Sequence, residues 1–263
     1  MTEVEERLID LPDNPVPEEV LQALELAFED KGGDESYLTG MKMAVPGTDR
    51  LYGVRVPDLR KLSREILRKY KGDQEALLNI ADLCWSQGSR EHQLVALFIL
   101  GGIKLETEER WGLGVRYLPD VNNWESCDQL CHALLGQALA EDAMCIDVLE
   151  TWLDDENFWI RRAALVSPAL LRRAKFSEDL AEDLDRRTLA MAAALLDDKE
   201  KYIRKAVDWT VREVIKRHYD LGLDWMMVQA SSIPSKTARS TLKLASKKLS
   251  KEDRENFLQA LEG

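Results

Sequence analysis

Two stretches of this sequence repeat one pattern 43 positions apart. Trp159-Ile-Arg-Arg-Ala-Ala and Tyr202-Ile-Arg-Lys-Ala-Val agree position by position, with an aromatic residue, Ile, Arg, a basic residue, Ala and a small apolar residue. Internal repeats of roughly 40–47 residues are typical of chains that stack helix upon helix. The repeat therefore predicts a stack of similar helical units.

Helical spacing of apolar residues continues through the whole chain. One example is the stripe Leu59, Leu62, Ile66 and Leu67, with Lys61, Arg64 and Arg68 off it. The expected helices cover 17–30, 37–43, 57–70, 76–85, 91–100, 108–118, 124–139, 143–153, 159–171, 180–196, 202–215, 225–229, 237–249 and 253–261. No segment alternates as a strand would, so we predict an all-α fold, an α-solenoid of HEAT-like helical repeats with a concave face.

The composition is that of a soluble globular protein, because 45% of the 263 residues are hydrophobic and 32% are charged. We expect an acidic N-terminal tail over residues 1–16 and a single helical-repeat domain over residues 17–263. The longest apolar run, Leu94 to Ile103, is about half the length needed to span a bilayer. The first ten residues lack the pattern of a signal peptide, which predicts a cytoplasmic protein.

The four cysteines do not form a disulfide framework in a chain of this size. Cys127 and Cys131 are four residues apart, but His132 is adjacent rather than opposed and no CxxC pair exists. Buried small apolar side chains are expected here rather than a metal site. We predict neither a metal nor a cofactor.

The net charge of -12 argues against a nucleic-acid partner until its distribution is considered. Between Lys199 and Lys251 there are 13 Lys and Arg against 5 Asp and Glu, a local balance of +8. This C-terminal part of the chain is therefore the expected electrostatic footprint for an anionic partner.

Three expected helices combine a tryptophan with a charged residue at helical spacing. Trp124 and Asp128 are four apart, while Trp159 and Trp209 each precede an arginine by three positions. These residues are Arg162 and Arg212. Such a set suits a ligand that is polyanionic outside and cationic or flat where chemistry occurs. The alternative is structural, with tryptophans in the core and arginines bonded to the neighbouring repeat.

Several segments together resemble the AlkD-like DNA alkylation repair family, over most of the chain from about Tyr37 to Leu249. The matching segments are Tyr-Gly-Val-Arg-Val-Pro-Asp-Leu-Arg-Lys-Leu (52–62), Ser-Arg-Glu-His-Gln-Leu-Val-Ala-Leu (89–97), Asn-Trp-Glu-Ser-Cys-Asp (123–128), Phe-Trp-Ile-Arg-Arg-Ala-Ala (158–164), Lys-Tyr-Ile-Arg-Lys-Ala-Val-Asp-Trp-Thr-Val-Arg-Glu (201–213) and Pro-Ser-Lys-Thr-Ala-Arg (234–239). The combination is specific although each piece alone is weak.

The resemblance implies a DNA glycosylase of HEAT-like repeats that removes cationic N3- and N7-alkylated purines from duplex DNA. It places Asp128 as the catalytic carboxylate, Trp124 and Trp209 against the deoxyribose of the lesion, and Arg162 as the cleft arginine. Further DNA contacts are expected on the concave face from Arg212, Lys205, Lys236, Arg239 and Tyr37.

The chemistry of these residue types agrees with that role. Alkylation at N3 or N7 makes the purine a cationic leaving group, so no strong general acid is needed. An ionised Asp128 can stabilise the oxocarbenium-like sugar and orient or deprotonate the attacking water. Neighbouring indole faces favour the cation by about 1–2 kcal/mol when they are desolvated.

We therefore predict a monomeric, metal-free, monofunctional alkylpurine DNA glycosylase of base excision repair, which leaves an abasic site in double-stranded DNA. One alternative is a non-catalytic binder of damaged or branched DNA that uses the same surface. The other is a HEAT-type protein-interaction scaffold, which the net charge of -12 favours. The sequence carries no P-loop, GxGxxG or HExxH pattern that would indicate other enzyme classes.

Overall fold

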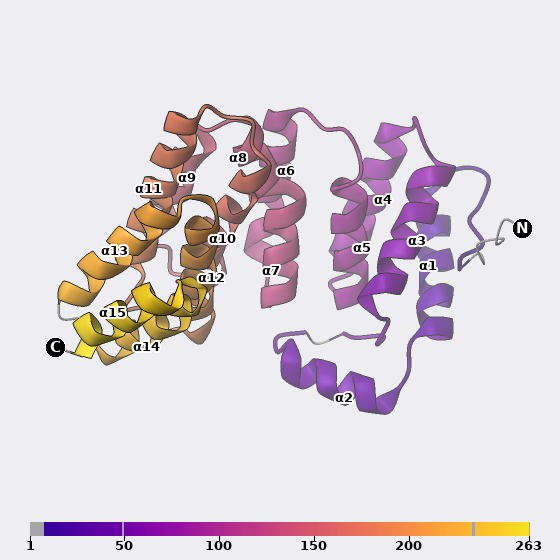
Figure 1. Cartoon of the computed structure of the whole chain (residues 1–263). Coiled ribbons are helices and arrows are strands. Elements are labelled where there is room, and N and C mark those ends of the chain that lie inside the picture. The colour runs from indigo at the N-terminus through magenta and orange to yellow at the C-terminus, as the bar shows by residue number, and fades with distance from the viewer. Residues whose placement is uncertain (1–7, 49, 233–234, 263) are drawn as a thin grey trace, which may run out of the picture. The chain divides into compact units, whose positions relative to one another are not determined.

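The computed structural model of the chain describes residues 8–48, 50–232 and 235–262, and these contain helices and no β-strand (Figure 1). The all-α prediction is therefore confirmed. The α-helices are α1 (Pro17–Lys31), α2 (Glu35–Ala44), α3 (Val56–Lys69), α4 (Gln74–Ser86), α5 (Arg90–Leu100), α6 (Thr107–Tyr117), α7 (Trp124–Leu130), α8 (Gly136–Glu141), α9 (Cys145–Thr151), α10 (Phe158–Val166), α11 (Glu178–Ala194), α12 (Lys201–Arg217), α13 (Tyr219–Ser231), α14 (Lys236–Ala245) and α15 (Lys251–Glu262). None of the described helices has the length and apolar character needed to cross a membrane.

The chain folds into two compact units. Unit 1 comprises residues 1–106 and 121–134, and unit 2 comprises residues 107–120 and 135–263. The single domain over 17–263 stays a prediction. The division separates the expected site residues, since Tyr37, Trp124 and Asp128 belong to unit 1 and the others to unit 2.

In unit 1, α5 packs against α3, α4 and α7, and α1 packs against α4. Three residues of the predicted apolar stripe of α3, Leu59, Leu62 and Ile66, are fully buried in this core, whereas the fourth, Leu67, is half-buried. Part of the expected acidic tail, residues 1–16, packs against the rest of unit 1. Ile9 and Leu11 are buried, and the Tyr70 hydroxyl donates a hydrogen bond to the Pro12 carbonyl at 2.8 Å.

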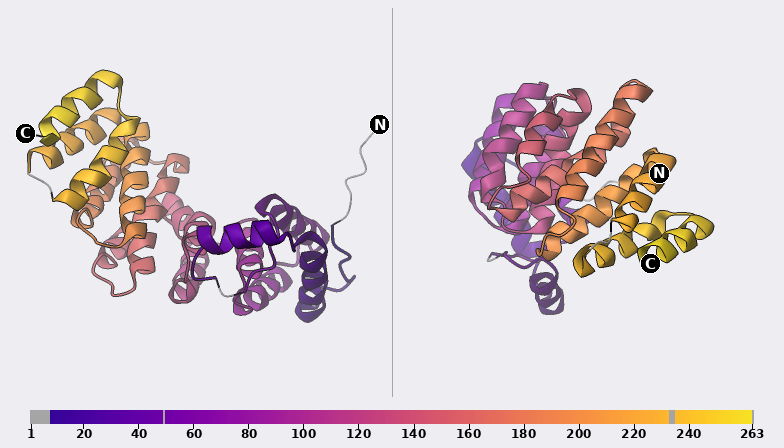
Figure 2. Two further views of the ribbon diagram at one scale, coloured as in Figure 1. Left: turned by 90° about the horizontal axis from the view of Figure 1, so that it is seen from below. Right: turned by 90° about the vertical axis from the view of Figure 1, so that its left-hand side faces the viewer.

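In unit 2, α12 is the central helix and packs against α10, α11, α13 and α14. Figure 2 shows this mainly orange part of the chain from two further directions. The two copies of the sequence repeat lie on α10 and α12. Their aromatic residues pack together, with ring centroids of Trp159 and Tyr202 5.0 Å apart. The Thr210 hydroxyl donates a hydrogen bond to the Leu165 carbonyl at 2.6 Å, which joins α12 to α10 just beyond the two repeat copies.

Helix boundaries follow local sequence signals where these are strong. The side chains of Ser177 and Ser250 accept hydrogen bonds from backbone N–H groups three residues on, as serines at the N-terminal cap of a helix commonly do. Three expected long helices are broken, and one of them, 237–249, ends at Ala245, where the 3-10 turn Ser246–Lys248 begins. Pro168 lies where α10 gives way to the 3-10 turn Ser167–Arg173, and the expected helix 124–139 is interrupted by a π-turn at Cys131–Leu135.

Candidate active site and nucleic-acid interface

The N-terminal end of α7 carries the first pair of expected site residues. Asn123 caps the helix by accepting a hydrogen bond from the Ser126 N–H at 2.9 Å. Trp124 follows as the first helical residue and Asp128 lies four positions later, so both project from one face of a regular helix. Both side chains are half-buried. The local geometry predicted for this pair is thus present.

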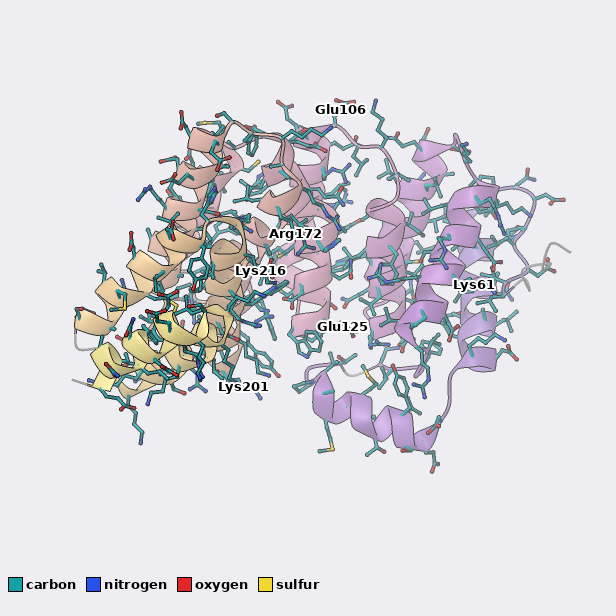
Figure 3. All side chains as sticks on the ribbon, viewed as in Figure 1. Lys61, Glu106, Glu125, Arg172, Lys201 and Lys216 are labelled. Carbon is teal, nitrogen blue, oxygen red and sulfur yellow. The ribbon has the colours of Figure 1, made fainter. Side chains whose placement is uncertain are left out.

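A buried ion-pair network holds that end of α7. Arg90 at the start of α5 is 1% exposed and donates two hydrogen bonds to Glu125, from Nε at 2.6 Å and from Nη2 at 3.0 Å. Its Nη1 donates to Glu91 at 3.1 Å and to the Val54 carbonyl at 3.0 Å. Glu125, labelled in Figure 3, is therefore neutralised by a fixed partner.

Glu91 extends the network to the loop before α3. Its carboxylate accepts hydrogen bonds from the backbone N–H groups of Tyr52 at 3.0 Å, Gly53 at 3.0 Å and Val54 at 3.3 Å. Three of the segments that carry the family resemblance, 52–62, 89–97 and 123–128, thus meet in one network of unit 1. Arg90, Glu91 and Glu125 thereby fix the backbone around the candidate site.

The indole of Trp124 is anchored at a second point. Its Nε1–H donates to the carbonyl of Ala44, the last residue of α2, at 2.8 Å. The loop after α2 then runs against the backbone at Asn122, where Gly47 adopts a φ of +94° and a Cβ would overlap the Asn122 carbonyl. The position of Trp124 therefore depends on a loop about 80 residues earlier in the sequence.

Directly after α7, the π-turn Cys131–Leu135 follows Asp128. The chain passes from unit 1 to unit 2 at residues 134 and 135, inside this turn. Single π-turns within helices are frequent at functional sites. Cys127 and Cys131 are fully buried there, and no group of three or more His, Cys, Asp or Glu among the described residues is arranged to hold a metal ion.

In unit 2, Trp209 lies half-buried on α12 and bonds to a residue that sequence analysis did not select. Its Nε1–H donates to the Glu213 carboxylate at 3.1 Å, four residues later. Glu213 also accepts from Lys216 Nζ at 2.5 Å and lies 3.6 Å from Arg172 Nη1. Burial alone would raise the pKa of Glu213, but Lys216, Trp209 and Arg172 hold it below the usual range. Figure 3 labels the two cations, Arg172 and Lys216, which are nearly half exposed.

The two arginines paired with tryptophans in the sequence have other partners in the structure. Arg162 is 4% exposed, and its Nη1 donates to the Tyr202 carbonyl at 2.5 Å. Arg212 forms an ion pair with Asp208, with Nε 3.0 Å from Oδ1. Burial raises the pKa of Asp208 and the pairing with Arg212 opposes that rise. Arg162 thus joins α10 to α12, whereas Arg212 keeps an exposed fraction of 38%.

The remaining expected DNA contacts differ in accessibility. Lys205 is exposed, with Nζ 5.8 Å from the Tyr202 ring centre, and Lys236 is exposed at the start of α14. Arg239 is half-buried and donates a hydrogen bond to the Leu261 carbonyl of α15. Tyr37 of α2 is half-buried beneath the Arg55 guanidinium, which lies 4.6 Å from its ring centre. Lys205 and Lys236 are therefore the most accessible of these predicted contacts.

Unit 1 also contains a basic surface, which lies outside the positively charged stretch 199–251 found in the sequence. A cavity of about 870 Å³ is bordered by Lys61, Arg64 and Arg68 of α3 together with Lys71 and Lys104 (Lys61 is labelled in Figure 3). The three α3 residues are spaced by three and four positions, so they form one ridge along the helix. Their sequence spacing is visible in advance, but Lys104 joins them only through folding.

The profile of one protein family, described as DNA alkylation repair enzyme, matches residues 25–249. A search of curated proteins finds no match. Solved structures share the fold at low identity. A predicted DNA alkylation repair enzyme from Enterococcus faecalis is 22% identical with a TM-score of 0.63, covering 84% of this chain and 98% of that one. AlkD2 from Streptococcus mutans is 19% identical with a TM-score of 0.56, covering 81% and 97%.

A third structure, smu.31 from Streptococcus mutans UA159, is 21% identical with a TM-score of 0.55 and covers 73% of this chain and 92% of its own. These likenesses show the helical-repeat fold, and the family profile extends over the segments 52–62, 89–97, 123–128, 158–164, 201–213 and 234–239. This chain therefore belongs to the DNA alkylation repair enzyme family.

Proposed function

We propose that this protein is a DNA glycosylase that hydrolyses the N-glycosidic bond of cationic N3- or N7-alkylated purines in duplex DNA and leaves an abasic site. The observation that carries the proposal is the arrangement on α7. Asp128 and Trp124 share one face, the indole is anchored to Ala44, and the nearby carboxylate of Glu125 is neutralised by Arg90.

The proposed mechanism needs one carboxylate and no acid. The alkylated purine already carries positive charge, so it departs as a neutral base when the glycosidic bond breaks. The ionised Asp128 stabilises the cationic sugar and orients the attacking water or accepts its proton. The half-buried face of Trp124 favours the same cation, on the order of 1–2 kcal/mol where water is excluded.

Unit 2 supplies the proposed duplex contacts. Lys205, Arg212, Lys236 and Arg239 bind phosphates, and Tyr37 of unit 1 adds a contact. Trp209 is proposed to face the deoxyribose, in an orientation that its bond to Glu213 maintains. For Arg162, burial and the bond to the Tyr202 carbonyl favour a positioning role within unit 2 over direct contact with the lesion.

The decisive experiment measures release of free methylated purine from N-methylated duplex DNA, without added metal, by the wild type and by Asp128→Asn. We expect release by the wild type and a loss of about 10²–10³-fold in the variant, with duplex binding retained. Asp154→Asn, at an exposed loop carboxylate, is the matched control and should keep full activity. Full activity of Asp128→Asn would contradict the mechanism, and binding without release by the wild type would favour a non-catalytic binder of damaged DNA.

A further inference from the structure

Unit 2 has a second surface that the proposed function does not use. Helices α11 and α13, both labelled in Figure 1, pack against each other and border a cavity of about 580 Å³. We call this cavity the α11–α13 groove and define it by Leu189 and Glu182 of α11 with Leu221, Asp224, Trp225 and Val228 of α13. Both the apolar residues and the charges of this groove point to a ligand.

An apolar stripe of α13 lines the groove instead of the core. Leu221, Trp225 and Val228 follow at spacings of four and three, so they share one helix face. Leu221 and Trp225 are half-buried and Val228 is 64% exposed, while Leu189 of α11 is buried beneath them. The indole N–H of Trp225 has no hydrogen-bond partner in the part of the chain that the structure describes. Trp225 is therefore not part of the core, since its side chain lines an open groove.

The groove is bordered by acidic side chains. Asp220 and Asp224 stand one turn apart on α13, and neither forms an ion pair with any described residue. The first turn of a helix accommodates Asp220, but Asp224 lies a turn further on, where a second like charge is unfavourable. On α11, Arg186 lines the groove but is paired with Glu182. The border therefore presents uncompensated negative charge around an apolar floor.

One end of the groove is held in place by a buried carboxylate. Asp185 is fully buried and accepts hydrogen bonds from His218 Nδ1 at 2.8 Å and from Arg217 Nε at 2.9 Å. His218 in turn lines the groove directly before α13. The groove is thus formed by packed helices with a fixed end, so a ligand meets a preformed surface.

We propose that the α11–α13 groove binds a basic amphipathic helix of a partner protein. Two or three large apolar side chains of such a helix fill the cavity against Leu221, Trp225 and Val228, as in other helix-in-groove complexes. Its Lys and Arg side chains pair with Asp220 and Asp224. DNA is excluded from this groove because phosphates meet carboxylates there. The acidic residues of this groove would then bind a protein, at a surface separate from the proposed DNA contacts Lys205 and Lys236.

The test uses the full-length protein and a pair of synthetic helical peptides with Leu at spacings of four and three, one carrying Lys and the other Glu at the flanking positions. Fluorescence polarisation measures binding to the wild type, to Asp220→Lys/Asp224→Lys and to Val228→Asp. The matched control is Glu108→Lys/Glu109→Lys, which changes the net charge equally on α6. Thermal melting verifies that each variant folds.

We expect the Lys peptide to bind the wild type and the control, and to lose at least about tenfold in affinity with each groove variant. The Asp220→Lys/Asp224→Lys variant should prefer the Glu peptide. Base release from methylated DNA, which does not involve the groove, should be unchanged. Three results would overturn the proposal: no binding of the Lys peptide at about 100 μM, equal loss in the control variant, or a wild-type dimer in sedimentation that Val228→Asp dissolves, which would assign the groove to a second copy.

Discussion

The Arg90 guanidinium and the Glu125 carboxylate, 35 residues apart, form a two-point ion pair at the N-terminal end of α7. The arginine is 1% exposed and Glu91 beside it is fully buried. Because Arg90 also binds Glu91, its removal would leave two carboxylates without their cation, one of them in the core.

The first prediction is that Arg90→Met lowers the free energy of unfolding by about 3–5 kcal/mol, the usual effect of removing one partner of a buried pair. Urea unfolding of the full chain measures it. Arg186→Met is the matched control, because Arg186 pairs with Glu182 at the surface and should cost about 0–1 kcal/mol. Equal losses in both variants would show that the network does not stabilise unit 1.

The second prediction concerns the loop that supports Trp124. Gly47→Ala places a Cβ against the Asn122 carbonyl at a φ of +94°, so we expect it to destabilise the protein by about 1–3 kcal/mol and to reduce base release. Gly112→Ala is the control. A Cβ at Gly112 of α6 meets nothing within 4 Å, and the change should stabilise the helix by about 0.5–1 kcal/mol. Unchanged stability of Gly47→Ala would show that the loop can move away.

The third prediction is a pH dependence set by His92. This side chain is fully buried, and burial together with the charge of Arg50 lowers its pKa to about 4. Between that value and the unfolded pKa of about 6.5, the unfolded chain binds the proton more readily. The stability of the folded protein should therefore fall as pH decreases through this window, by up to about 3 kcal/mol from this group.

Comparison with His92→Asn isolates the effect, because Asn keeps a polar atom near Ser89, whose hydroxyl lies 2.7 Å from His92 Nδ1. The difference in unfolding free energy between wild type and variant should shrink from pH 7 to pH 4. A difference that stays constant across this range would mean that His92 titrates alike in both states.

The fourth prediction separates phosphate contacts from other charges. Lys205→Ala and Lys236→Ala should each reduce the slope of log affinity against log salt for duplex DNA by about one. Lys61→Ala/Arg64→Ala tests the α3 ridge in the same titration. Arg186→Ala on α11 is the control and should leave the slope unchanged. A slope that no variant alters would favour a protein rather than a DNA partner.

The sequence by itself determined the features that depend on neighbours along the chain. Helical periodicity placed the core stripe of α3, and serine caps marked the starts of α11 and α15. The spacing of Trp124 and Asp128 already brought an indole and a carboxylate onto one face, because side chains four apart meet within a helix. The family resemblance rests on such local segments, and the family profile confirms it.

Only the tertiary structure decided which charged side chains are paired within the protein and which remain accessible to a ligand. Arg162 is buried against the Tyr202 carbonyl 40 residues later, and Glu125 is neutralised by Arg90 35 residues earlier. Arg172 pairs with Glu213, and Lys104 joins the α3 ridge, through packing that no helical spacing encodes. Such contacts depend on how helices distant in sequence pack, since burial and long-range pairing set whether a charged side chain stabilises the core or meets a ligand.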